Sequence, residues 1–308
     1  MTESPRFSDD HVKAWRDTGF TIIPGFFSER EIAPIRSDYE KIYGLPGEGE
    51  NGVPWDAKKD GAIGSFREAQ FKNIDVLPYR QGTVEMNLLS LHPAVIQLSR
   101  ALLNTNQVHL YQSHTWAKYT GETDYDQEFH CDFGNHTLLA PADAIEQRTV
   151  DIIVYLTDVT DAHGALHYVN KPDAIELLGK DTVYAVGDEK QALLKGREQS
   201  AAAPSGTIVA HSIDTFHRGT NLTAPGGYRF TMTIGYKAAG NEMIGYHVWQ
   251  TGADRDWPLV LNHASPEQLE CLGIPLPGNP FWSKRTLKLT QARWPDWDMQ
   301  PYFAAAEI

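Results

Sequence analysis

The sequence predicts a mainly β protein with flanking helices, in which two antiparallel sheets form a jelly roll, or double-stranded β-helix. Segments that are rich in β-branched residues or alternate in polarity cluster in the middle of the chain, at 107–118, 149–159, 205–211 and 228–236. Apolar residues at helical spacing lie mainly in the first 105 residues. A chain of 308 residues is long enough for one large domain that holds both parts.

We expect a single domain, 1–308, with three regions. Residues 1–105 form a helical buttress, and residues 106–240 form the jelly-roll core that carries the functional site. Residues 241–308 form an aromatic-rich C-terminal extension. Its rings either brace the outer sheet or line the mouth of the site, and the sequence leaves both readings open.

Local signals place the elements of the buttress. Ser8 and Ser28 are suited to cap two helices, and Gly19 is suited to end the first of them. Residues 93–104 predict a third helix with an apolar stripe. Residues 47–64, which include five glycines, predict a loop that is either a connection or a lid over the site.

The composition is acidic, with a formal charge of -13 and a pI near 5.3. Nucleic acids and anionic membranes reward clustered Lys and Arg, so neither is an expected partner. Two cysteines, Cys131 and Cys271, do not make a disulfide framework and fit a cytoplasmic setting. No leader peptide is recognisable, and no apolar run approaches the roughly 20 residues of a membrane helix. A small-molecule partner is expected, while the oligomeric state is not indicated.

The motif His130-x-Asp132 has the spacing of two metal ligands on one strand, because side chains at i and i+2 point to the same side. A third ligand has to come from elsewhere, and His217 lies between a predicted strand and a turn-rich stretch. Two histidines and a carboxylate leave three adjacent positions open on a metal, the arrangement of non-haem iron(II) oxygenases. We expect these three residues to be catalytic and to bind the metal, with His211 as the alternative to His217.

The strand predicted from Tyr228 alternates, with Arg229, Thr231 and Thr233 on one side and apolar residues on the other. A guanidinium that faces the interior needs a charged partner, because burying it alone is costly. The far carboxylate of an oxoacid cosubstrate, held bidentately by Arg229 with the Thr231 hydroxyl at the same oxygen, satisfies that face.

The strand before the metal motif places Gln112, His114, Trp116 and Lys118 on one face. If this face is turned into the barrel, Lys118 and Gln112 reach the cosubstrate and Trp116 forms part of the substrate wall. A Lys118 that is solvated at the end of its strand fits the sequence equally well, and the sequence does not decide between the two.

Phe133 and His136 follow the metal motif and are candidates for contact with the substrate. His136 lies four residues after Asp132 and has left the strand, so it is expected beside the metal and not on it. Strand alternation turns Cys131 away from the metal, and we expect it to be a buried apolar residue.

Taken together, these residues resemble the phytanoyl-CoA dioxygenase (PhyH) family of iron(II)/2-oxoglutarate-dependent oxygenases. The resemblance rests on His130-x-Asp132, on His217, and on Arg229 twelve residues later, and it covers most of the chain. Other stretches that are similar to family members lie at residues 20–28, 92–95, 272–275 and 293–299.

The resemblance implies a cupin-like double-stranded β-helix that binds Fe(II), with 2-oxoglutarate and O2 as cosubstrates. It places the 2-oxoglutarate carboxylate on Arg229 and Thr231, with Lys118 and Gln112 as further contacts. Related halogenases have Gly or Ala at the position of Asp132, so this chain is expected to oxidise and not to halogenate. The implied reaction hydroxylates, or otherwise oxidises, a C–H bond of a small organic metabolite and releases succinate and CO2.

The alternative is a metal-binding jelly-roll protein that acts as an isomerase or as a binding module without O2 chemistry. Such a protein would not need Arg229, so 2-oxoglutarate binding distinguishes the two hypotheses.

Overall fold

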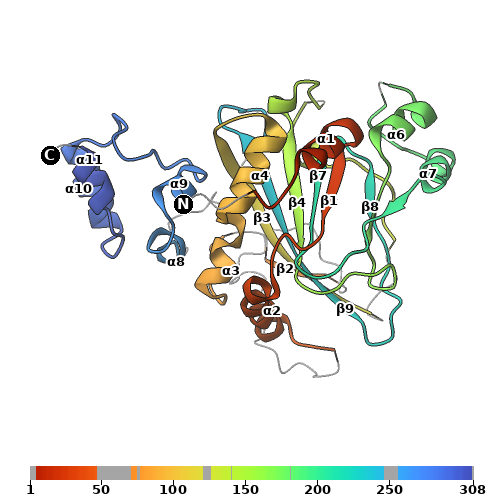
Figure 1. Ribbon diagram of the computed structural model, residues 1–308, viewed down its shortest axis with the longest axis horizontal. Helices are drawn as coiled ribbons and strands as arrows, with labels where there is room; N and C mark the ends of the chain where they lie inside the picture. Colours follow the sequence, from red (N-terminus) through yellow and green to blue (C-terminus); the bar gives the residue numbers. More distant parts are fainter. Residues whose placement is uncertain are drawn as a thin grey trace.

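The computed structural model describes residues 5–46, 71–74, 77–120, 126–139, 141–180, 182–245 and 256–306. Two antiparallel sheets form the body of the molecule, with helices packed around them (Figure 1). The predicted fold class, mainly β with flanking helices in a double-stranded β-helix, is confirmed. The predicted loop at 47–64 lies outside the described residues.

The larger sheet has the strand order β1-β7-β4-β9-β3-β2. Strands that are distant in sequence therefore lie side by side, as expected for a jelly roll rather than a series of hairpins. The four central segments predicted from residue pattern all form strands of this sheet. The bounds are β1 (Phe20–Ile23), β2 (Phe71–Ile74), β3 (Val108–Tyr119), β4 (Thr149–Tyr155), β7 (Ile208–Ser212) and β9 (Tyr228–Ala238).

The smaller sheet has the order β6-β5-β8, with β5 (Leu166–Tyr168), β6 (Gln199–Ser200) and β8 (His217–Gly219). An isolated antiparallel bridge between His130 and His217 adds the first residue of the metal motif to the edge formed by β8. Helices α6 (Lys171–Leu178) and α7 (Asp188–Lys195) lie beside this sheet (Figure 1).

Polar and apolar side chains alternate along β9 as predicted, and its apolar face is the one that packs on the helices. Phe230, Met232 and Ile234 are fully buried and belong to the main hydrophobic cluster, together with Ile35 and Leu98 of the buttress helices. The opposite side chains of β9 therefore face the interior between the sheets. The helices of this layer are α1 (Asp9–Thr18), α2 (Glu29–Tyr43), α3 (Val84–Leu88), the 3-10 turn η2 (Leu89–Leu91) and α4 (Pro93–Leu103).

The predicted helix signals in the buttress are confirmed. Ser8 and Ser28 each form a capping box with the third residue of the helix that follows. Gly19 ends α1 with φ of 90°, a left-handed conformation that glycine adopts without steric cost. The second helix begins at Glu29 although Pro34 lies inside it.

The C-terminal aromatic residues pack mainly on one another. The rings of Trp282 and Trp297 each contact the Tyr302 ring, with centroids 4.8 Å and 5.2 Å apart. They belong to α10 (Lys284–Arg293) and α11 (Gln300–Ala305) and the segments around them, which lie away from the sheets (Figure 1). These rings therefore brace the extension itself; whether the extension also braces the outer sheet or lines the mouth of the site stays a prediction.

The extension joins the body through α8 (Pro258–Leu261) and α9 (Pro266–Glu270). The backbone N–H of Leu110 on β3 donates to the carbonyl of Cys271, at 2.7 Å, directly after α9. Within the part of the chain that the structure describes, no helix is both long enough and apolar enough to cross a bilayer. The division into three regions of one domain stays a prediction.

Candidate metal centre

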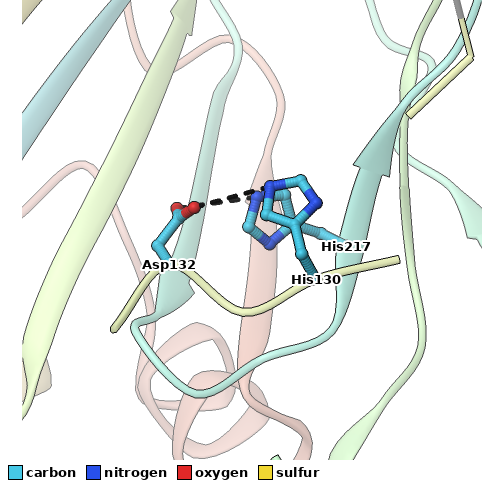
Figure 2. Close-up of side chains that lie close together, drawn as sticks. All are labelled: His130, Asp132 and His217. Atoms are coloured by element: carbon cyan, nitrogen blue, oxygen red, sulfur yellow. Dashed lines mark ion pairs between the residues drawn. The ribbon is translucent and has the colours of Figure 1, made fainter. Parts of the chain in front are cut away.

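A backbone bridge brings His130 and His217 together. The two residues exchange both N–H···O=C hydrogen bonds at 3.0 Å, which makes them directly opposite neighbours of an antiparallel pair. Directly opposite side chains lie on the same face, and the two imidazole centroids are 4.6 Å apart. Residues 87 positions apart in the sequence therefore present two nitrogens to one point (Figure 2).

Asp132 reaches that point from a turn and not from a strand. We expected His130 and Asp132 on one strand, but strand pairing here is a single bridge at His130. Asp132 has helical dihedral angles, φ -75° and ψ -13°, and precedes the short helix α5 (Phe133–His136). The turn directs the carboxylate back towards the two rings, so the expected convergence occurs with a different backbone (Figure 2).

The three side chains, which we call the metal centre, are arranged as the ligands of one ion. The Oδ1 atom of Asp132 lies 3.6 Å from Nε2 of His130, and its Oδ2 atom lies 3.5 Å from Nε2 of His217. All three donor atoms lie within 4.8 Å of one another. Ligands about 2.1 Å from an ion are roughly 3 to 3.5 Å apart, so an ion fits between these atoms.

The backbone fixes which nitrogen each imidazole presents. The Nδ1 atom of His130 donates to the carbonyl of Glu128 at 2.8 Å, and Nδ1 of His217 donates to the carbonyl of Thr215 at 3.0 Å. A carbonyl can only accept, so the proton of each neutral ring is on Nδ1 and the lone pair is on Nε2. Both Nε2 atoms face Asp132, which is the orientation that metal ligands require.

Burial and charge give Asp132 and His217 the protonation states of metal ligands. Burial disfavours the charged carboxylate of Asp132, but the adjacent His217 and His211 outweigh this effect and hold its pKa well below its usual value. Burial also lowers the pKa of His217 to about 3, against the opposing attraction of Asp132. At neutral pH the site therefore offers a carboxylate and a neutral imidazole, as divalent metal binding requires.

Cys131 lies between two of these residues but is not part of the centre. Its side chain packs against the apolar residues around Phe129 and Phe133. Burial raises the pKa of the Cys131 thiol well above its usual value. A protonated thiol in an apolar setting is a poor metal ligand, which agrees with the expected orientation.

Asp132 also belongs to a second group of possible donors, together with Asp151 and His211. Asp151 is buried on β4, and hydrogen-bond donors already occupy both of its oxygens. Its Oδ1 accepts from Tyr111 and, at 2.7 Å, from Nε2 of Gln112, while its Oδ2 accepts from the Thr149 hydroxyl at 2.7 Å. These three donors make Asp151 part of a buried hydrogen-bonded network.

Sequence reasoning missed Asp151 and Tyr111. A signal was present, since Asp151 is the one charged residue in the hydrophobic strand Thr149–Tyr155. A buried acid in such a strand must find donors inside the protein. Gly235 of β9 lies between Gln112 and Asp151 in the strand register. A Cβ atom there would lie 2.6 Å from a ring carbon of Tyr111, so glycine leaves the room that this network occupies.

Lys118 and Arg229, which we call the cation pair, lie directly opposite each other on β3 and β9. Both are buried, with 1% and 7% of their surface exposed, so the reading of Lys118 as a solvated strand end was wrong. Burial and the neighbouring Arg229 lower the pKa of Lys118 to about 7. Among the described residues, no carboxylate lies within ion-pair distance of Arg229.

The cation pair is tied to the smaller sheet, which carries a ligand of the metal centre. The Lys118 ammonium donates to the carbonyl of Thr220 at 2.7 Å, three residues after His217. Arg229 donates to the carbonyl of Gly164, just before β5. Backbone carbonyls that flank β8 and β5 therefore hold both cations against the smaller sheet.

The other predicted site residues occupy different parts of the interior. Thr231 is buried on the inner face of β9 opposite Trp116, whose indole N–H donates to the Thr233 hydroxyl at 3.1 Å. Gln112 belongs to the Asp151 network, six residues along β3 from Lys118. The structure therefore brings Trp116 and Thr231 near the cation pair, while Gln112 lies beside the metal centre.

Phe133 and His136 lie on α5, next to the metal centre. Phe133 is buried and its ring meets that of Tyr184 edge to face, with centroids 5.2 Å apart. The Nδ1 atom of His136 lies 2.6 Å from the Tyr111 hydroxyl, which itself donates to Asp151. His136 thus adjoins the network behind Asp132 and is not one of the three ligands; its contact with substrate stays a prediction.

Comparison with known proteins identifies related sequences and folds. A sequence model of the family described as phytanoyl-CoA dioxygenase (PhyH) matches residues 15–229, a segment that includes the metal centre and ends at Arg229. No curated protein matches the chain.

Among solved structures, EctD from S. alaskensis in its apo form shares 19% identity over 81% of this chain and 85% of its own, with a TM-score of 0.58. The non-haem α-ketoglutarate-dependent carbocyclase SnoK from nogalamycin biosynthesis shares 20% identity over 78% of this chain and 88% of its own, with a TM-score of 0.55. HygX from Streptomyces hygroscopicus, solved with nickel, 2-oxoglutarate and hygromycin B, shares 16% identity over 76% of this chain and 88% of its own, with a TM-score of 0.53. At these identities, the likeness shows a common fold.

Proposed function

This chain belongs to the phytanoyl-CoA dioxygenase (PhyH) family of iron(II)/2-oxoglutarate-dependent oxygenases, and we propose that it oxidises a C–H bond of a small organic metabolite. In a hydroxylation, one oxygen atom of O2 enters the substrate as the new hydroxyl. The other oxygen atom enters succinate, and 2-oxoglutarate loses its C1 carboxylate as CO2. An iron(II) ion bound by His130, Asp132 and His217 would supply the O2 activation.

The observation that carries the proposal is the convergence of two imidazole Nε2 atoms and one carboxylate. The Nδ1 atom of each imidazole is already hydrogen-bonded to the backbone. The backbone carbonyls of Glu128 and Thr215 hold the two imidazoles with their lone pairs towards Asp132. Two histidines and one carboxylate are the facial ligand set of non-haem iron(II) oxygenases. A metal held by these three side chains would have positions left for a chelating oxoacid and O2.

The cation pair supports 2-oxoglutarate as the oxoacid. Two buried cations on opposite strands repel each other, and a carboxylate between them relieves this repulsion. Arg229 can hold the carboxylate bidentately, with the Thr231 hydroxyl on the same inner face as a further donor. HygX, whose fold this chain shares, was solved with nickel and 2-oxoglutarate bound.

The retained carboxylate of Asp132 supports oxidation in place of halogenation, because it occupies the position that a chloride would need. Hydroxylation is the reaction that we propose. SnoK, a carbocyclase, has a similar fold, so ring formation has to be distinguished from hydroxylation. Mass spectrometry of the product separates the two: hydroxylation adds one oxygen atom, whereas ring closure removes two hydrogen atoms.

The direct test is to titrate 2-oxoglutarate into anaerobic protein with and without Fe(II), and then to add O2 and follow succinate. We expect 2-oxoglutarate to bind tightly only with Fe(II) present, and succinate release to accelerate with a true substrate from a metabolite library. The His130→Ala variant should lose both responses, while Asp188→Ala on exposed α7 should keep them.

The isomerase or binding-module hypothesis makes the opposite prediction. Such a protein would bind metal but would neither bind 2-oxoglutarate through Arg229 nor consume it. Parent protein that binds Fe(II) but forms no succinate with any library member, and shows no 2-oxoglutarate binding, would refute the oxygenase proposal.

A further inference from the structure

His211 lies against the metal centre but has a hydrogen-bonding pattern unlike that of the two ligand histidines. Its Nε2 atom lies 3.2 Å from Oδ2 of Asp132, and its Nδ1 atom lies 3.1 Å from the Tyr168 hydroxyl. Its ring centroid is 4.5 Å from that of His217. Both of its nitrogens are therefore within hydrogen-bond distance of side chains. His130 and His217 make their hydrogen bonds through Nδ1 to backbone carbonyls, and their Nε2 atoms lie farther from the Asp132 oxygens, at 3.6 Å and 3.5 Å.

The direction of these two hydrogen bonds follows from the chemistry of the groups. An ionised carboxylate only accepts, so Nε2 of His211 carries the proton and donates to Asp132. In a neutral ring Nδ1 is then the acceptor, and the Tyr168 hydroxyl donates to it. The chain of donors runs from Tyr168 through His211 to Asp132, and each bond polarises the next.

The two donors come from rigid positions in different sheets. His211 is on β7, paired with Phe20 of β1 on one side and with Asp151 of β4 on the other, within the larger sheet. Tyr168 is on β5 of the smaller sheet, opposite His217 in register. Its ring stacks on that of Phe20, with centroids 4.7 Å apart and an interplanar angle of 14°.

Asp132, in contrast, lies on a turn outside both sheets. A carboxylate on a turn can rotate, and it can bind a metal through one oxygen or through both. A donor at Oδ2 leaves Oδ1 as the oxygen with free lone pairs on the side of His130. Binding through one oxygen keeps three coordination positions open, and binding through both would close one of them.

We propose that Tyr168 and His211 are positioning residues that hold Asp132 as a ligand through one oxygen only, so that the metal keeps room for both the oxoacid and O2. This inference rests on the proposed metal site. It assigns to His211 a role other than that of a third ligand, and it gives Tyr168 a role that no motif in the sequence indicated.

The test is the affinity for Fe(II), and for Co(II) as a redox-stable probe, measured anaerobically by calorimetry on the full chain. Outer hydrogen-bond partners of metal ligands typically contribute 10- to 100-fold to metal affinity. We expect a loss in this range for His211→Leu and a smaller loss, about threefold to tenfold, for Tyr168→Phe. His211→Gln retains an N–H donor near the position of Nε2 and should recover most of the affinity.

A matched control separates positioning from stability. Tyr236→Phe removes another buried hydroxyl from the larger sheet. Tyr236 is on the face of β9 that packs on the helices, and its hydroxyl donates to the backbone carbonyl of Ser90. It should reduce stability without changing metal affinity. Circular dichroism and thermal unfolding check that each variant is folded, and Tyr168→Phe remains informative if His211→Leu does not fold.

A spectroscopic readout tests the number of oxygens that Asp132 contributes. The visible charge-transfer band of the anaerobic Fe(II)–2-oxoglutarate complex responds to the other ligands, and it should shift in His211→Leu but not in His211→Gln. If parent protein binds metal, and His211→Leu and Tyr168→Phe bind it as tightly as Tyr236→Phe with an unshifted band, this inference is overturned while the proposed function stands. Parent protein that binds no metal would overturn both.

Discussion

The metal centre and the cation pair lie in the same interior but are assembled in different ways. The metal centre combines an isolated strand bridge with a turn, and backbone carbonyls orient its two imidazoles. The cation pair comes from two long strands of the larger sheet, and strand register alone brings Lys118 and Arg229 together. The first site therefore depends on local orienting bonds, while the second depends on the pairing of the whole sheet.

This difference predicts that the two sites can be removed independently. Variants in the metal centre should abolish metal binding, and 2-oxoglutarate binding should fall only as a consequence. Variants in the cation pair should weaken 2-oxoglutarate binding and leave the metal affinity unchanged. Of the four predictions below, given in order of decreasing effect, three test this separation, and the one on Gly235 tests the packing beside Asp151.

The largest effect is expected for Asp132→Ala. The variant removes the only charged ligand, so Fe(II) affinity should fall by more than the roughly 10- to 100-fold typical of an outer hydrogen-bond partner. Calorimetry under anaerobic conditions measures the loss, with Asp188→Ala on exposed α7 as the control. Metal affinity equal to that of the parent would show that Asp132 is not a ligand.

Arg229→Ala should weaken 2-oxoglutarate binding by about 100-fold, since it removes a bidentate, charge-assisted pair of hydrogen bonds. Fe(II) affinity should stay within twofold of the parent, because Arg229 does not contact the metal centre. Arg36→Ala, which removes a cation paired with Glu29 on α2, is the matched control. An equal loss of metal and 2-oxoglutarate affinity would contradict the separation of the two sites.

Gly235→Ala should reduce the free energy of unfolding by about 1–3 kcal/mol, the usual cost of overpacking a filled interior. The new methyl group would meet the Tyr111 ring and the Gln112 side chain, both of which must reach Asp151. The urea midpoint measures this change. Gly240→Ala, where the structure shows no atom within 4 Å of the added carbon but φ is 83°, reports backbone strain alone.

The smallest effect is a pH dependence of 2-oxoglutarate binding. Because burial and Arg229 lower the pKa of Lys118 to about 7, the ammonium is charged below this pH and loses its proton above it. An anion binds the charged form better, so affinity should be highest below pH 7 and fall by a few-fold between about pH 6.5 and 8.5. Lys118→Met should abolish this dependence; a parent affinity that rises with pH would contradict the assignment.

Several features could be predicted from the sequence because they depend on short stretches of chain. The alternation of β9 placed Arg229 and Thr231 on one face and the apolar residues on the other, and the buried core agrees with this. The capping residues Ser8 and Ser28 began the expected helices. The residue types at positions 130, 132 and 217 indicated a metal centre, although the strand expected for Asp132 is a turn.

Other features could not be predicted, because they depend on strand register. Nothing near Asp151 in the sequence indicates that Tyr111 and Gln112 donate to it, since β3 and β4 are separated by β9 in the sheet. The same holds for Tyr168, which reaches His211 from the other sheet. Burial of Lys118 was equally undecided, because the partner strand of β3 was unknown.

The sequence by itself determined which donor groups the protein has and which face of each element carries them, because backbone geometry sets the side-chain direction within an element. The tertiary structure decided which of these groups meet. It paired His130 with His217, turned Asp132 towards them, and placed Lys118 opposite Arg229. Those meetings depend on sheet topology and register, which arise from the packing of the whole chain and not from any one segment of it.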